Sequence, residues 1–238
     1  MAFRHGRNTK VLVGGYDLSA YFNEASVSNT IETGETTTFG NSAKTYITGL
    51  ADGTVSLSGL FDGASGAVDP VLAGVLGSDT AVVFTVGTEG LAITRRVQAG
   101  ESRATSYEIS SPVADVVSAS AELQVTGGVG ESVSLCDLAS VTATGNGTAV
   151  DNSASTSNGG IGVLHVTANA HNNSSTFKIQ HSADNSTWAD LVTFTTVATT
   201  VVTAERVAVT GTVNRYLRAV RTLAGTGAVT FHINFSRS

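Results

Sequence analysis

The segment from Thr30 to Leu76 places the strongest constraint on the fold, because it combines a polar arm, a strand pair and one short helix. Residues 45–50 and 54–60 alternate in side-chain polarity on either side of Ala51-Asp52-Gly53. Alternation around an Asp-Gly signal predicts a β-hairpin, here with a three-residue turn. We therefore expect two strands that meet at residues 51–53.

A short amphipathic helix is predicted after this hairpin. Five aliphatic side chains recur there at spacings of three and four: Val68, Val71, Leu72, Val75 and Leu76. This spacing gives one apolar face over about three turns. Asp69 before Pro70 predicts the N-terminus of the helix, and Gly77 predicts its end. Burial of such side chains is worth roughly 1.5 to 3 kcal/mol each, so we expect the helix to dock on a sheet.

The arm before the hairpin is too polar to form a core of its own. Residues 30–43 contain only Ile31 and Phe39 as large apolar groups. Loops of this length inside a compact domain are usually functional or disordered. The arm is therefore either a mobile loop or a segment that a neighbouring subunit orders.

The rest of the chain predicts further short strands and a division into two domains. In the first half, strands are expected at residues 81–86, 91–98, 103–109 and 115–126, with a turn at 99–101. Residues 140–160 are low in bulk and charge and predict linker and loops. Six strands spaced as in a β-sandwich follow at 161–168, 177–181, 191–196, 205–210, 216–221 and 228–235. The expected fold class is all-β and mainly antiparallel, with a sandwich or barrel and one flanking helix in residues 1–138 and a β-sandwich in 139–238.

Composition and charge narrow the function classes. Charged residues make up only 13% of the chain, which suits surfaces that meet other protein. Residues 1–135 carry seven basic and fourteen acidic groups, a balance of −7, whereas residues 136–238 carry six and five, a balance of +1. An acidic first half disfavours sequence-specific DNA binding but suits a surface that DNA must pass without sticking. No apolar run approaches the roughly 18 residues of a membrane span, and the N-terminus lacks a signal-peptide core, so we expect folding in a cytoplasm.

No pattern of catalytic or metal-binding residues is present. The single cysteine, Cys136, has no partner for an internal disulfide. The five histidines lack metal-ligand spacing, although His165, His181 and His232 lie on predicted strands that can meet in space. Gly-Gly pairs at 14–15 and 127–128 lack the strand-to-helix context of a phosphate loop, and no nucleophile elbow occurs. We therefore expect a protein that is not an enzyme and binds no cofactor or metal.

Two further features have both a structural and a functional interpretation. Trp188, the only tryptophan, follows an Asp-Asn-Ser turn and is either a sugar-stacking platform on the outer surface or a cap on the sandwich core. The basic N-terminal residues are either a solvated terminus or an arm that docks on an acidic neighbour: Arg4, His5, Arg7 and Lys10.

The sequence KVLVGGYDLSAYFNEASVSNTIETGETTTFGNSAKTYITGLADGTVSLSGLFDG resembles the major tail tube proteins of long-tailed, siphovirus-like bacteriophages. The resemblance consists of a Thr-rich arm that ends in Phe39-Gly40, a Tyr-x-x-Gly-Leu strand at 46–50 and a Gly-Leu-Phe-Asp close at 59–62. Residues 178–188 and 205–221 are also similar to the C-terminal part of such proteins.

This resemblance implies a structural virion protein, made in the host bacterial cytoplasm and located in the virion tail. It implies hexameric rings that stack into a hollow tube, partners among the tape measure, distal tail and terminator proteins, and passage of double-stranded DNA without specific binding. It also implies that an arm bridges neighbouring subunits, with these residues at the contact: Thr30, Ile31, Glu32, Thr33, Glu35, Thr37, Phe39, Lys44 and Tyr46. The basic N-terminal residues would then contact the next ring.

Alternatives remain open at this level. The second half is either an outer decoration domain or a second tube-like unit, which would make the ring a trimer. The whole chain is alternatively a capsid or virion decoration protein, or a carbohydrate-binding β-sandwich module that depends on Trp188.

Overall fold

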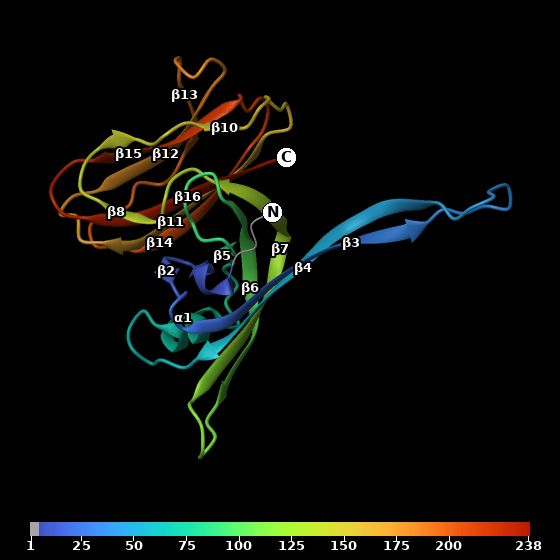
Figure 1. Cartoon of the computed structure of the whole chain (residues 1–238), viewed down its shortest axis with the longest axis horizontal. Coiled ribbons are helices and arrows are strands. Elements are labelled where there is room, and N and C mark those ends of the chain that lie inside the picture. The colour runs from blue at the N-terminus through green and yellow to red at the C-terminus, as the bar shows by residue number, and fades with distance from the viewer. Residues whose placement is uncertain (1–4) are drawn as a thin grey trace.

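Two β-sheets and one short α-helix form the fold in a computed structural model, which describes residues 5–238 (Figure 1). Arg4 therefore lies outside the described residues. The predicted all-β, mainly antiparallel fold class with one short helix is confirmed. The elements of the first half are η1 (Gly6–Asn8), β1 (Lys10–Val13), β2 (Tyr16–Asp17), β3 (Phe22–Glu35), β4 (Tyr46–Leu60), α1 (Val68–Val75), β5 (Val82–Gly87), β6 (Arg96–Ser110) and β7 (Ser118–Ser134). Those of the second half are β8 (Ala139–Val141), β9 (Gly145–Asn146), β10 (Val150–Asp151), β11 (Gly160–Asn169), β12 (Ser175–Ser182), β13 (Ala189–Thr193), β14 (Thr203–Val209), β15 (Tyr216–Leu223) and β16 (Val229–Arg237).

The larger sheet has 11 strands and passes through both halves of the chain. Its main order is β14-β11-β16-β7-β6-β5-β1-β2, with the β3–β4 hairpin joined to β7 through β4. The two halves meet where β16 pairs with the end of β7, with Asn234 opposite Ser134. A second sheet of five strands, which includes β10-β15-β12-β13, lies entirely in the second half.

Two main hydrophobic cores correspond to the two halves. One contains Phe84, Leu57 and Leu123 and lies beneath α1, and the other contains Phe177, Phe231 and Leu164 between the two sheets. A smaller apolar cluster joins the halves, because Val83 and Ala99 of the first half pack against Val163 of the second. The halves therefore have separate main cores but share a sheet and a buried contact.

The predicted turns at 51–53 and 99–101 are wrong. Strand β4 runs through residues 51–53 without interruption and pairs with β3 along its length. Gly53 faces the core, where an added Cβ would lie 2.8 Å from Val129, so close packing explains this glycine. Likewise, residues 91–98 and 103–109 are not two strands: β6 is one strand with a bulge around Gly100.

The linker predicted at 140–160 contains three short strands. Strands β8, β9 and β10 pair with β16 or β15, and the Val150 side chain is buried in the second core. By contrast, all six strands predicted beyond residue 160 are present, with boundaries that differ by a few residues.

Helix α1 docks as predicted but is capped differently. Val68, Val71 and Leu72 are buried, and Gly77 beyond its end has a φ of 71°. Of the other two residues predicted for the apolar face, Val75 is partly buried and Leu76 lies beyond the helix and is 43% exposed. Ala67 holds the N-cap position, so the predicted Asp69 cap is wrong. The Asp69 carboxylate instead accepts a hydrogen bond from Tyr107 Oη on β6 at 3.0 Å, and burial together with this bond raises the pKa of Tyr107 to about 12.

Candidate functional site

The most prominent feature is a projecting hairpin, which we define as residues 30–53 of β3, β4 and the loop between them (Figure 1). Strand β4 pairs with β7 only from Thr54 to Leu60, so the preceding residues leave the sheet as a two-stranded extension. The turn therefore lies at residues 36–45, some ten residues before the predicted position. All of the residues predicted for the subunit-contact arm are carried by this extension.

The loop at the end of the hairpin is held by its own polar side chains. Asn41 Oδ1 accepts from Thr38 N and Thr38 Oγ1, both at 2.7 Å. Thr37 Oγ1 accepts from Thr45 N at 3.1 Å, and Lys44 Nζ lies 3.2 Å from Glu35 Oε2. These contacts stabilise the loop locally. An exposed pair such as Lys44–Glu35 contributes at most about 1 kcal/mol.

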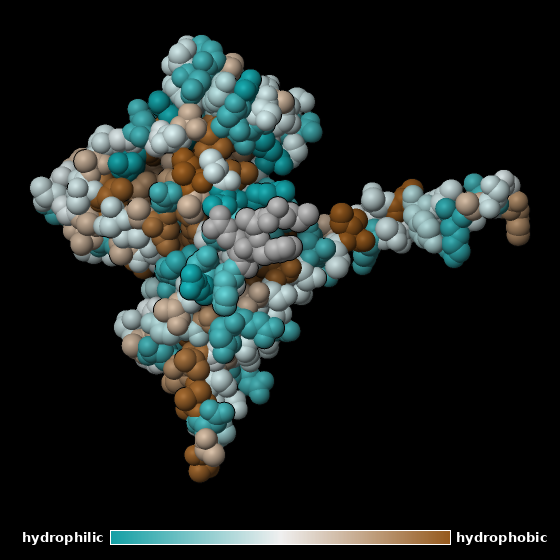
Figure 2. All heavy atoms as spheres, viewed as in Figure 1, coloured by the Kyte–Doolittle hydropathy of each residue, from teal (hydrophilic) through white to brown (hydrophobic). Residues whose placement is uncertain are grey.

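Large apolar side chains of the projecting hairpin are exposed to solvent (Figure 2). The Phe39 side chain at the far end is fully exposed, and Leu50 is 78% exposed. The others are Ile31, Tyr46 and Ile47. Nothing in the described part of the chain covers these residues, so the hairpin presents apolar area that a partner can bury.

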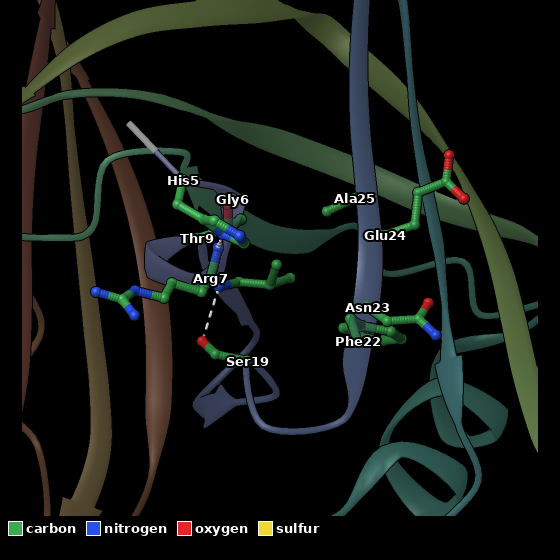
Figure 3. A pocket seen from close by; sticks show the side chains of 10 residues that line it. His5, Gly6, Arg7, Thr9, Ser19, Phe22, Asn23, Glu24 and Ala25 are labelled. Carbon is green, nitrogen blue, oxygen red and sulfur yellow. Dashed lines mark hydrogen bonds between the residues drawn. The ribbon is translucent and has the colours of Figure 1, made fainter. Parts of the chain in front are cut away.

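The base of β3 borders a groove of about 480 Å³ on its open side (Figure 3). His5 and Arg7 line one wall, and Phe22 to Ala25 line the other. His5 Nδ1 accepts from the Arg7 backbone amide at 3.1 Å, whereas Lys10 Nζ pairs with Asp17 at 3.1 Å. Of the predicted N-terminal contact residues, His5 and Arg7 thus lie beside the free edge of β3, whereas Lys10 does not line this groove.

The face of strands β3, β4, β7 and β6 that points away from the core is acidic and rich in serine. Glu24, Ser58, Ser120 and Glu108 form one row across the four strands, and Glu122 lies in the next row. The ten residues that border this shallow surface include no lysine or arginine. The geometry therefore gathers three of the first-half carboxylates on one side of the sheet.

A second extension was not predicted to be a contact site. The end of the β6–β7 hairpin, which we call the β6–β7 tip, exposes Val113 at 109%, Val116 at 63% and Ile109 at 46%. Leu60 of β4, which pairs with Ser118, is also 47% exposed beside it. Their only signal in the sequence is the Pro112-Val113 turn between two predicted strands.

Two of the predicted histidines do meet, in a buried polar network between the halves. His165 lies directly opposite His232 on neighbouring strands, and both are fully buried. His165 Nδ1 is 2.7 Å from the Gly14 carbonyl oxygen, and Nε2 is 2.9 Å from Thr85 Oγ1. The carbonyl can only accept, so Nδ1 carries the proton and Thr85 donates to Nε2. Burial lowers the pKa of His165 to about 4 and that of His232 to about 3.

The Gly14-Gly15 pair lies at this contact between the halves. A Cβ at Gly15 would lie 2.4 Å from the Thr203 backbone nitrogen, so the turn after β1 packs directly on the start of β14. His181 lies apart on β12, where its Nδ1 accepts from Asn214 N at 3.3 Å. Among residues 5–238, no group of three or more His, Cys, Asp or Glu side chains is placed to hold a metal ion.

Trp188 lies on the outer side of the five-stranded sheet and is half-buried. The Arg218 guanidinium carbon is 4.1 Å from the centre of its ring, and Arg218 is fixed by two hydrogen bonds to Gln180 Oε1. The preceding turn is held by Asp184, whose Oδ1 accepts from two backbone amides, and these hydrogen bonds lower the pKa of Asp184. Trp188 is not among the residues of the sandwich core, and Arg218 occupies one face of its indole.

None of the helices in the described part of the chain has the length and apolar character needed to cross a membrane.

Comparison with known proteins gives structural matches only. No protein-family model and no curated protein sequence matches the chain. A chain from the virion of a native gene transfer agent (GTA) particle is similar, with 16% identity and a TM-score of 0.45 over 53% of this chain and 97% of that chain. A chain from the tail of an empty GTA particle with C6 symmetry gives 15% identity and a TM-score of 0.45 over 54% and 98% of the two chains.

A second group of matches spans nearly the whole chain. The SPP1 Dit protein, described as a paradigm of the hub adsorption apparatus in phages that infect Gram-positive bacteria, gives 17% identity and a TM-score of 0.36 over 95% of this chain and 98% of that chain. The chain is thus structurally similar to components of phage and GTA tails and of a baseplate hub. At these TM-scores and identities the likeness alone assigns no function.

Proposed function

We propose that this chain is the major tail tube subunit of a long-tailed bacteriophage, and that it forms hexameric rings that stack into a hollow tube for DNA delivery. The observation that carries the proposal is the projecting hairpin. It places the residues of the arm outside the body of the subunit, and five of its large apolar side chains are exposed. Such a hairpin contributes little to the stability of its own subunit, and its exposed apolar side chains can be buried against a neighbouring subunit.

The open edges of the sheet support closure into a ring. Among the described residues, strand β3 pairs only with β4, and residues 105–110 of β6 pair only with β7. The part of the larger sheet formed by β3-β4-β7-β6 therefore ends in two free edges. Free edges are templates for strand pairing between chains. Pairing of β3 in one copy with β6 in the next is a head-to-tail contact, and such contacts close into rings when the rotation allows.

The acidic face supports the assignment of a bore. In a ring joined through these edges, the face with Glu24, Glu108 and Glu122 would be shared by all copies and would line the inside. Like charge keeps DNA phosphates from binding tightly, because no counterions are released by lysine or arginine. We assign residues 1–138 to the ring and 139–238 to an outer decoration domain, and the N-terminal residues His5 and Arg7 to contacts beside the free edge of β3.

Negative-stain electron microscopy across a concentration series tests this function. Hollow tubes with six-fold end views are the expected result. Three-fold rings would favour a duplicated tube unit, and rings that never stack, even after a tail initiator complex is added, would point to a hub-like component instead. Persistent monomers under both conditions would contradict the proposal.

A further inference from the structure

We propose that the β6–β7 tip is the contact between stacked rings, and that it packs against the projecting hairpin of a second copy in the adjacent ring. This inference rests on the proposed function, because it requires that rings form. It adds a partner surface to the arm that the sequence did not indicate.

The two extensions leave opposite ends of the same four strands, β3-β4-β7-β6, of the larger sheet. Leu60 of β4 pairs with Ser118, beside the β6–β7 tip, whereas Thr54 of β4 pairs with Gln124, beyond which the projecting hairpin departs. The tip and the hairpin therefore leave the strands at opposite ends, and in Figure 1 the hairpin extends to the right whereas the tip extends downward. If copies join sideways through their free edges, one side of each ring carries the tips and the other side carries the hairpins.

Exposed apolar side chains are concentrated at these two ends. Among the described residues, nine of the eleven large hydrophobic side chains that are exposed belong to the projecting hairpin or lie at the β6–β7 tip. Two apolar ends of one sheet match each other when identical subunits stack head to tail, because each then covers the other.

Charge at the tip is also low enough for burial. Asp115 is the only charged residue between positions 110 and 117, and its Oδ1 accepts from the Val116 backbone amide at 2.7 Å. The tip thus exposes Val113 and Val116 beside a single carboxylate, that of Asp115, which already accepts a hydrogen bond. Burial of uncharged aliphatic groups is the dominant favourable term in most protein association.

The first test is the double variant Val113→Ser, Val116→Ser, with Val201→Ser as a matched control on an exposed loop away from both extensions. We expect the double variant to form rings at wild-type concentration but to need at least tenfold more protein to form tubes. The control should form tubes as the wild type does. Thermal unfolding midpoints should agree among the three proteins, because all the altered side chains are exposed.

Photo-crosslinking identifies the partner surface. Benzoylphenylalanine at position 113, in assemblies mixed from isotopically labelled and unlabelled protein, should link to residues 30–53 of another copy. Crosslinks only to another tip or to the sandwich would overturn this inference, and so would tube formation by the double variant at the wild-type concentration. Neither result would contradict the proposed tail tube function. Wild-type protein that forms no rings would overturn both proposals together.

Discussion

Acid should weaken the fold through the histidines buried between the two halves. Burial lowers the pKa of His165 to about 4 from an ordinary value of 6.5. Below pH 6.5 the unfolded chain binds a proton at this residue, but the folded protein does not until about pH 4. The stabilisation is therefore complete above pH 6.5, falls as the pH drops from 6.5 towards 4, and stays constant below that. At pH 5 the loss from His165 is about 2 kcal/mol.

The variant His165→Gln isolates this contribution. A neutral amide keeps a donor and an acceptor near Gly14 and Thr85 but takes up no proton. We expect urea unfolding of the wild type to lose about 2 kcal/mol more than the variant between pH 7.5 and pH 5, since the carboxylates titrate in both. His5→Gln controls for the same replacement at an exposed histidine. Equal pH dependence in the wild type and in His165→Gln would refute the reasoning.

Three further predictions concern assembly, the helix contact and the closure between the halves. Phe39→Ser should abolish tube formation without a change in the thermal midpoint, because this side chain is fully exposed; loss of the monomer fold would contradict a role in contact only. Tyr107→Phe should lower the free energy of unfolding by about 1 kcal/mol, as measured by urea titration, because it removes the hydrogen bond to Asp69. Gly15→Ala should cost about 1 to 3 kcal/mol or prevent folding, since its Cβ meets the Thr203 backbone, and a variant as stable as the wild type would show that the halves are not fixed there.

Local patterns were sufficient to predict most strands and the helix. The regular spacing of apolar runs in the second half and the spacing of Val68, Val71 and Leu72 reflect which side chains are buried, and burial is what stabilises these elements. Helix docking was predicted for the same reason. These features need no knowledge of which strand pairs with which.

Glycine was the main source of error, because tight packing and turns use it equally. Asp52-Gly53 looks like a turn, yet Gly53 is required by the approach of Val129, and Asp52 Oδ1 accepts from the Gly53 amide within an extended strand. Gly100 likewise marks a bulge against Phe84. The close approach comes from residues distant in sequence, so no local pattern distinguishes the two uses.

The residues of the candidate site were predicted, but their arrangement in an extended hairpin was not. The arm was identified by its lack of apolar groups, whereas its pairing as an extended hairpin depends on β3 and β4 continuing past the end of their pairing with β7. The β6–β7 tip and the His165–His232 pair depend on strand neighbours that only the tertiary fold supplies. Such neighbours are invisible in a single sequence.

The position of β16 has a consequence for biosynthesis. This strand lies inside the sheet, between β11 and β7, and also pairs with β8, yet it is translated after every strand that it joins. During synthesis, the edges of β7 and β11 that pair with β16 therefore remain unpaired until β16 leaves the ribosome. Only then can β16 join the two halves by hydrogen bonds. The large sheet can therefore be completed only after residues 229–237 have been synthesised.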